Sequence, residues 1–219
     1  MGSGGMSYRE RKGRRIAAAM KKQTPKGKWK PLDISRFQGW TLSRVEARLR
    51  KLKHEELFAF DENGKIVAAY RGGRDSVRFP SSLFKRKGLT VTHGHPAGID
   101  GFGGTLSIRD TKNMLISDWA QHRAVASGQG ELNYILRKGR NADPKAFLAK
   151  IVSDESKLVS RADRAYMMGL KKALARGKPW RSALHVARQM EVGEISAWYK
   201  ENAPKYGYEY IVRKEPYEY

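Results

Sequence analysis

The sequence Val91-Thr92-His93-Gly94-His95-Pro96, with Ser107-Ile108-Arg109-Asp110 shortly after it, predicts a strand, a glycine-rich loop and the start of a helix. Alternate side chains of a strand leave the same face, so His93 and His95 are expected to point at one spot. Ser107 and Asp110 are three residues apart, a spacing that places both on one face of a helix. Two imidazoles and a carboxylate can therefore converge on one cation.

The composition indicates a globular chain with an unusual charge. Hydrophobic residues make up 40% of the 219 residues, enough for one well-buried domain or a domain with an annex. Forty-four Lys and Arg stand against 22 Asp and Glu, a formal net charge of +22 that favours a polyanionic partner, above all nucleic acid. The alternative is that the excess charge only solvates the surface. The absence of cysteine excludes disulfides, thiolate metal sites and cysteine nucleophiles.

The chain is expected to divide into an N-terminal arm, a central domain and a C-terminal annex. Residues 1–5 resemble a cloning scar, and residues 8–30 carry ten basic residues and one acid, which predicts a mobile basic arm or a poorly buried helix. No secretory signal follows Met6, and no apolar run approaches the ~20 residues that span a bilayer. The expected divisions are a scar and basic arm at 1–35, a metal-binding domain at 36–140, and a basic helical annex ending in a strand at 141–219.

Hydrophobic periodicity and turn residues predict an α/β (α+β) fold, a mixed sheet flanked by helices with a C-terminal helical annex. Thr41 is expected to cap the first helix of the domain, and Asn63-Gly64 to turn a hairpin. Helices are expected at 41–53, 80–87 (or a loop), 107–120, 144–160, 162–176, 180–190 and 194–203, and strands at 56–61, 65–71, 75–79, 89–93, 122–127, 131–138 and 208–213.

Two imidazoles, one carboxylate and an open fourth position describe a catalytic zinc site, since a structural site is closed by four protein ligands. We expect one Zn²⁺ per chain, held by His93, His95 and Asp110. A general base is expected from Glu55 or Glu56, one of which can point inward from the strand that follows them. Ser107 is expected to donate a hydrogen bond to the oxyanion formed on an attacked carbonyl.

Each element of this site has a second interpretation. Ser107 and Asp110 also form a capping box, His-Gly-His-Pro can be a polar strand end, and Glu55-Glu56 can be a solvated helix end. The conjunction of all three on compatible elements favours the metal site. His54, His122 and His185 are scattered through the chain and are expected to be structural or exposed.

The ordered set of a glutamate on an early strand, His-x-His-Pro ending a later strand, and Ser-x-x-Asp opening a helix resembles the JAMM (or JAB) metalloprotease pattern. The resemblance covers residues 41–138 and is closest to the JAB-like domains of phage head-morphogenesis proteins and bacterial polymorphic toxins. It implies a cytidine-deaminase-like sheet, zinc held by His93, His95 and Asp110, a water-activating glutamate and an assisting Ser107. Eleven residues separate His95 from Ser107, a few more than the usual seven or so.

The sequence thus predicts a zinc-dependent hydrolase that cleaves a peptide or isopeptide bond in a protein substrate, located in a bacterial cytoplasm or a phage virion. The basic arm and annex are expected to hold nucleic acid. Two alternatives remain: a nucleic-acid-binding or virion structural protein that uses a JAB-like scaffold without hydrolysis, and a metal-dependent nuclease.

Overall fold

The computed structural model describes residues 30–98, 103–128 and 132–214. The basic arm over residues 8–29 and part of the glycine-rich loop, residues 99–102, lie outside the described residues. The strands are β1 (Lys30–Pro31), β2 (Glu56–Phe60), β3 (Ile66–Arg71), β4 (Thr90–His95), β5 (Gln121–Ala126), β6 (Leu132–Lys138) and β7 (Tyr208–Lys214). The helices are α2 (Leu42–Leu49), α3 (Ile108–Ile116), α4 (Pro144–Ala175) and α5 (Trp180–Asn202), with short 3-10 helices at Ile34–Phe37, Ser81–Lys85 and Ala203–Tyr206.

One mixed sheet organises the described residues, with strand order β1-β3-β2-β4-β5-β6-β7. Its only parallel pair is β4–β5, in which His93 is opposite Ala124 and His95 opposite Ala126. A parallel pair needs a crossover connection, and α3 provides it, which returns the chain from the end of β4 to the start of β5. The predicted α+β class with a mixed sheet is confirmed. The β4–α3–β5 unit is the part of the fold that brings the two quoted stretches together.

Local signals explain where several elements begin. The Thr41 hydroxyl accepts from the Arg44 amide and starts α2, as predicted. Gly64 has φ +75° in the β2–β3 turn, a conformation that glycine adopts without steric cost. Ser107 and Asp110 cap each other reciprocally at the start of α3. The capping-box interpretation of these two residues is thus confirmed, and it does not compete with a metal site, because one carboxylate can do both.

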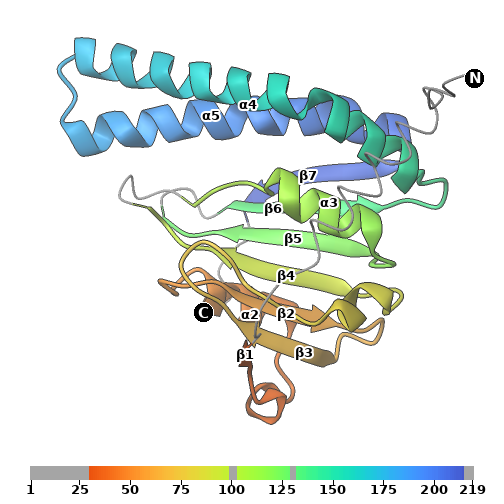
Figure 1. The fold of residues 1–219 in the computed structure, drawn as a ribbon. Helices are drawn as coiled ribbons and strands as arrows, with labels where there is room; N and C mark the ends of the chain where they lie inside the picture. The colour runs from red at the N-terminus through yellow and green to blue at the C-terminus, as the bar shows by residue number, and fades with distance from the viewer. Residues whose placement is uncertain (1–29, 99–102, 129–131, 215–219) are drawn as a thin grey trace, which may run out of the picture.

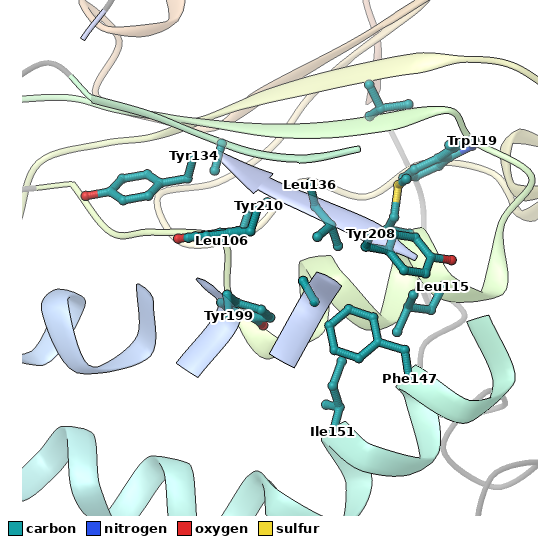
Figure 2. Packing of buried hydrophobic residues seen from close by; sticks show 14 of the residues in the cluster. Leu106, Leu115, Trp119, Tyr134, Leu136, Phe147, Ile151, Tyr199, Tyr208 and Tyr210 are labelled. Atoms are coloured by element: carbon teal, nitrogen blue, oxygen red, sulfur yellow. The ribbon is translucent and has the colours of Figure 1, made fainter. Parts of the chain in front are cut away.

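The sheet buries both faces, and its alternation separates two cores. On one face, Leu57, Val91 and Ala124 belong to a large cluster that includes residues from α3, α4 and α5. On the other face, Phe58 and Val125 pack with α2 and the first 3-10 helix. Figure 2 shows Phe147 and Ile151 of α4 and Tyr199 of α5 reaching toward Leu136, Tyr208 and Tyr210 of the sheet. Side chains at alternate positions of one strand therefore enter two different environments.

The C-terminal helices differ from the prediction. Residues 144–160 and 162–176 were expected as two helices but form the single 32-residue α4, and 180–190 and 194–203 form the single α5. Three further expectations are wrong: residues 75–79 form no strand, α2 ends at Leu49 rather than at residue 53, and α3 ends at Ile116 rather than at residue 120. Figure 1 shows α4 and α5 as a long hairpin whose closed end projects past the strands. The predicted final strand is confirmed as β7, paired with β6.

Among the residues that the structure describes, no helix combines the length and the apolar character that a membrane span needs.

Candidate metal centre

His93 and His95 leave β4 on the same face, as the strand period requires, and their side chains meet. The Nε2 atoms of the two rings lie 2.8 Å apart. His93 is fully enclosed, whereas His95, at the end of the strand, keeps 14% of its side chain exposed. The pair thus has a buried member and a member that faces the opening of the site.

Each of these rings is oriented through its other nitrogen. His93 Nδ1 lies 3.0 Å from the Arg123 carbonyl oxygen, and His95 Nδ1 lies 3.0 Å from the Gly104 carbonyl oxygen. A carbonyl oxygen only accepts, so both Nδ1 atoms carry the proton. In the neutral rings both Nε2 atoms then present lone pairs to each other, which is unfavourable unless a proton or a cation lies between them. The hydrogen bond that each ring makes through Nδ1 to a backbone carbonyl is the arrangement that orients metal-binding histidines.

Asp110, in the first turn of α3, completes a triangle with the two rings. Its Oδ1 lies 3.4 Å from His93 Nε2, and its Oδ2 lies 3.4 Å from His95 Nε2. Burial acts to raise the pKa of Asp110, but His93 and His95 outweigh it and hold that pKa well below its usual range. Burial likewise opposes the charged form of His93, yet Asp110 and Glu55 raise its pKa on balance. The surroundings therefore favour positive charge at the point between the three groups.

The hydroxyl and the amide of Ser107 both contact the side chain of Asp110. Its hydroxyl donates to Asp110 Oδ2 at 2.6 Å, and its amide donates to the same oxygen at 2.8 Å. Both donors fix the carboxylate in place. The predicted donation from Ser107 to an oxyanion requires its hydroxyl to leave Asp110 first.

His122, at the start of β5, was expected to be structural or exposed; it is buried and lies beside this group. Parallel register places His122 opposite Val91 and on the face of His93, and one ligand atom from each of His93, Asp110 and His122 lies within 4.8 Å of the others. This buried group can hold a metal ion. The signal that could have revealed it is the alternation along β5. His122 is a polar residue on the same inward-facing side of the strand as Ala124 and Ala126.

The two nitrogens of His122 have different surroundings. Nδ1 lies 3.0 Å from the Asp110 carbonyl oxygen, and Nε2 is buried without a hydrogen-bond partner. Burial lowers the pKa of His122 to about 3, with the charge of His93 acting in the same direction, so the ring is neutral. Its Nδ1 proton fixes the backbone of Asp110. Its Nε2 atom carries no proton, so a cation can bind to the lone pair of this atom.

Glu55 and Glu56, which the sequence did not separate, lie on opposite faces of the sheet. Glu56 accepts two hydrogen bonds from Arg48, at 2.9 and 3.1 Å, on the α2 face. Glu55 faces the cleft together with His93 and His95. Burial raises the pKa of Glu55, and the two histidines partly offset that rise. The structure thus brings five of the six predicted site residues together and places Glu56 apart from them.

An open cleft of about 570 Å³ lies over these groups. One wall is the loop from Arg74 to Phe79, and the other is α5, which contributes Arg188, Glu191, Val192 and Ile195. Arg188 is held by Glu191 at 2.7 Å, and a Cβ on Gly104 would lie 3.3 Å from its Nη2. Arg74 and Arg109 are exposed at the same cleft. Three arginines therefore line the cleft around the acidic and imidazole centre, together with the carboxylates of Asp75 and Glu191.

The donor atoms lie near the spacing of a tetrahedral site. Atoms held about 2.0–2.1 Å from one ion at tetrahedral angles are about 3.3 Å apart; the two Nε2 atoms lie 2.8 Å apart, and each lies 3.4 Å from a different oxygen of Asp110. Two imidazoles and a carboxylate, without thiolate, are ligands that zinc accepts. His95 and His122 are alternative third ligands. His95 Nε2 lies 2.8 Å from His93 Nε2 and 3.4 Å from Asp110 Oδ2, and His95 has the exposure that an open coordination position needs.

Comparisons with protein-family models, curated proteins and solved structures found no match to this chain.

Proposed function

We propose that this protein is a zinc-dependent hydrolase of the JAMM/JAB type that cleaves a peptide or isopeptide bond. The observation that carries the proposal is the pair of Nε2 atoms of His93 and His95, 2.8 Å apart, with each Nδ1 donating to a backbone carbonyl. Asp110 and Glu55 lie at the same cleft, as the resemblance requires. In this proposal His93, His95 and Asp110 hold the metal, and His122 acts through its hydrogen bond to the Asp110 carbonyl.

Zinc bound there would supply the Lewis acidity that acidifies a water and polarises a carbonyl. Glu55 would take the proton from the attacking water and pass it to the leaving amine. Its raised pKa suits this exchange, because a general base works best when its pKa approaches the operating pH. Arg74, Arg109 and Arg188 would hold a carbonyl or carboxylate of the substrate at the cleft.

Metal content separates the two candidate ligand sets. We expect about one zinc per purified chain, and loss of that zinc in His95→Ala and Asp110→Asn. His122→Gln is expected to keep the stoichiometry and to weaken affinity about 10- to 100-fold, the effect of removing an outer partner of a ligand. The opposite ranking, with His122→Gln metal-free and His95→Ala loaded, would assign the third ligand to His122.

Catalysis is tested by Glu55→Gln against Glu56→Gln, each loaded with zinc. Glu55→Gln is expected to retain the metal and to lose hydrolysis of any peptide or ubiquitin-like fusion that the parent cleaves. Glu56→Gln is expected to keep it, because that carboxylate lies on the other face. Equal activity in the Glu55→Gln variant would exclude Glu55 as the base.

A metal-dependent nuclease is the second candidate, favoured by the three arginines at the cleft. A phosphodiester carries the negative charge that such a rim attracts. Incubation of metal-loaded protein with supercoiled plasmid and with single-stranded DNA distinguishes the candidates. Cleavage that requires both Asp110 and Arg188 would favour the nuclease.

A further inference from the structure

We propose that the projecting end of the α4–α5 hairpin binds single-stranded nucleic acid and that the bound strand follows α5 toward the cleft. This binding surface, which we call the hairpin tip, comprises residues 164–188. The inference concerns binding and does not depend on the metal or on hydrolysis.

The hairpin tip carries only positive charge. Seven Lys and Arg occur between Arg164 and Met190, and no Asp or Glu interrupts them. Six of the seven are exposed, and Arg188 is half-buried at the cleft. Because like charges on a thin two-helix projection repel one another, this composition does not stabilise the hairpin. A polyanion relieves the repulsion and releases its own counterions.

The two helices of the tip pack against each other through a seam that includes small side chains. Ala165 and Ala173 of α4 are buried together with Ala183 and Ala187 of α5. A Cβ on Gly169 would lie 2.9 Å from the Ala187 Cα, so the two helices are in close contact.

Four large apolar side chains of the tip are exposed, whereas Leu184 is buried. Met167 and Met168 are 49% and 47% exposed, Leu174 is 40% exposed, and Trp180 is 57% exposed. An exposed indole among cations is suited to stacking on a base, and stacking requires a strand whose bases are unpaired.

One face of α5 connects the tip to the cleft. Residues 181, 185, 188, 192 and 195 follow the spacing of a single helical face. The last three of them, Arg188, Val192 and Ile195, line the cleft. Arg181 and His185 therefore continue the cleft wall outward, over about 12 Å of helix from Trp180 to Arg188. A strand whose base stacks on Trp180 can place its phosphates along this face.

The experiment compares two triple charge reversals in the full chain. Arg176→Glu, Lys178→Glu and Arg181→Glu change the tip. Lys51→Glu, Lys65→Glu and Lys87→Glu make the same charge change at exposed positions outside the hairpin. Both variants keep the basic N-terminal arm. Binding is measured by fluorescence anisotropy of a labelled 20-nucleotide oligothymidylate over a range of salt concentrations, after circular dichroism has verified folding.

The tip triple is expected to weaken oligothymidylate binding at least tenfold relative to the control triple. It should also flatten the slope of log K against log salt by about 2, the loss of three phosphate contacts at about 0.7 each. Trp180→Ala is expected to weaken single-strand binding roughly 5- to 150-fold, the effect of losing one stacked base, and to leave binding of a duplex of equal length unchanged.

Equal losses in the two triples would overturn the assignment of the site to the tip. An unchanged affinity in Trp180→Ala would overturn the stacking on this indole and with it the preference for single strands. Phosphatidylserine vesicles test the other anionic surface that exposed Met, Leu and Trp can enter. Vesicle binding that the tip triple abolishes, with oligonucleotide affinity equal to that of the control, would replace nucleic acid by a membrane.

Discussion

Glu55 and Glu56 are consecutive in the chain, yet their carboxylates lie on opposite faces of the sheet. The backbone of Glu55 continues the β2–β3 ladder, since its amide donates to Gly73 and its carbonyl accepts from Gly72, both at 2.7 Å. Strand alternation therefore applies to both residues. Glu56 is paired with Arg48, whereas Glu55 is buried beside the histidines of the candidate metal centre. The pair offers a matched comparison of a structural and a candidate functional carboxylate.

Glu55→Gln is expected to stabilise the chelated, metal-free protein at pH 7. Burial raises the folded-state pKa of Glu55 above the unfolded value, so its ionised form disfavours folding. That penalty is absent below the unfolded pKa, develops as the pH rises to the folded pKa, and is full above it. Thermal melts of both proteins should show a gain of about 1–3 kcal/mol at neutral pH and none near pH 4. A loss of stability at pH 7 would contradict this assignment.

Glu56→Gln is expected to act in the opposite direction. Burial opposes ionisation of Glu56, but Arg48 and His54 outweigh it and lower its pKa. The stability from this carboxylate is present above the unfolded pKa and is lost as the pH falls through the folded pKa. The variant should lose about 1–2 kcal/mol at pH 7, since Arg48 is partly exposed, and the difference should shrink in acid. Urea titrations at pH 7 and pH 3.5 measure both values.

Ser107→Ala removes one cap and one support of the candidate ligand Asp110. We expect a loss of about 0.5–2 kcal/mol in stability from the cap and a 10- to 100-fold weaker zinc affinity. Ser107→Thr keeps the hydroxyl and is the control. Chelator competition measures the affinity. If Ser107→Ala lost the expected stability of about 0.5–2 kcal/mol but kept its zinc affinity, Ser107 would serve only to cap α3.

Buried charges also connect α2 to three strands. Glu46 accepts from Arg123 at 2.5 and 2.9 Å, from Asn133 at 2.8 Å and from Thr92 at 3.1 Å. Glu46→Gln is expected to cost about 3–5 kcal/mol, because it removes the negative charge that lies beside the buried Arg123 guanidinium. Glu46→Leu combined with Arg123→Met should cost less than the sum of the two single changes. Additive losses in this cycle would mean that the pair is not coupled.

Two helical glycines give opposite expectations for the same substitution. Gly193→Ala should stabilise the protein by about 0.5–1 kcal/mol, because a Cβ there meets no atom within 4 Å and alanine favours the helix. Gly169→Ala should destabilise it by about 1–3 kcal/mol, since the Cβ would press against the Ala187 backbone. Thermal melts compare the two. Stabilisation by both would mean that the seam is looser than the distances indicate.

The sequence was sufficient to predict the features that depend on strand alternation and helix capping. The predictions were wrong where the outcome depends on whether one helix continues into the next, or on how strands far apart in the sequence pair. His93, His95, Ser107 and Asp110 were predictable because each depends on spacing within one element. His122 was not, because its place depends on the parallel register of two strands.

The C-terminal helices show a second limit. Nothing between residues 160 and 162 breaks a helix, so the predicted boundary there had no physical cause. Gly193 weakens a helix without ending it once tertiary packing supports both sides. Residues 75–79 alternate like a strand, but Gly73 donates to the Ser76 carbonyl at 2.9 Å and the segment turns back on itself.

Gly103 lies near the end of the long loop between His95 and Ser107 and holds the chain against the sheet. Its amide donates to the Ser127 carbonyl at 2.8 Å, and a Cβ there would lie 2.4 Å from the His95 carbonyl oxygen. The chain is thus fastened to the end of β5 just before Ser107 and Asp110. The contacts of Gly103 and of the residues after it therefore determine where Asp110 lies beside the histidines of β4.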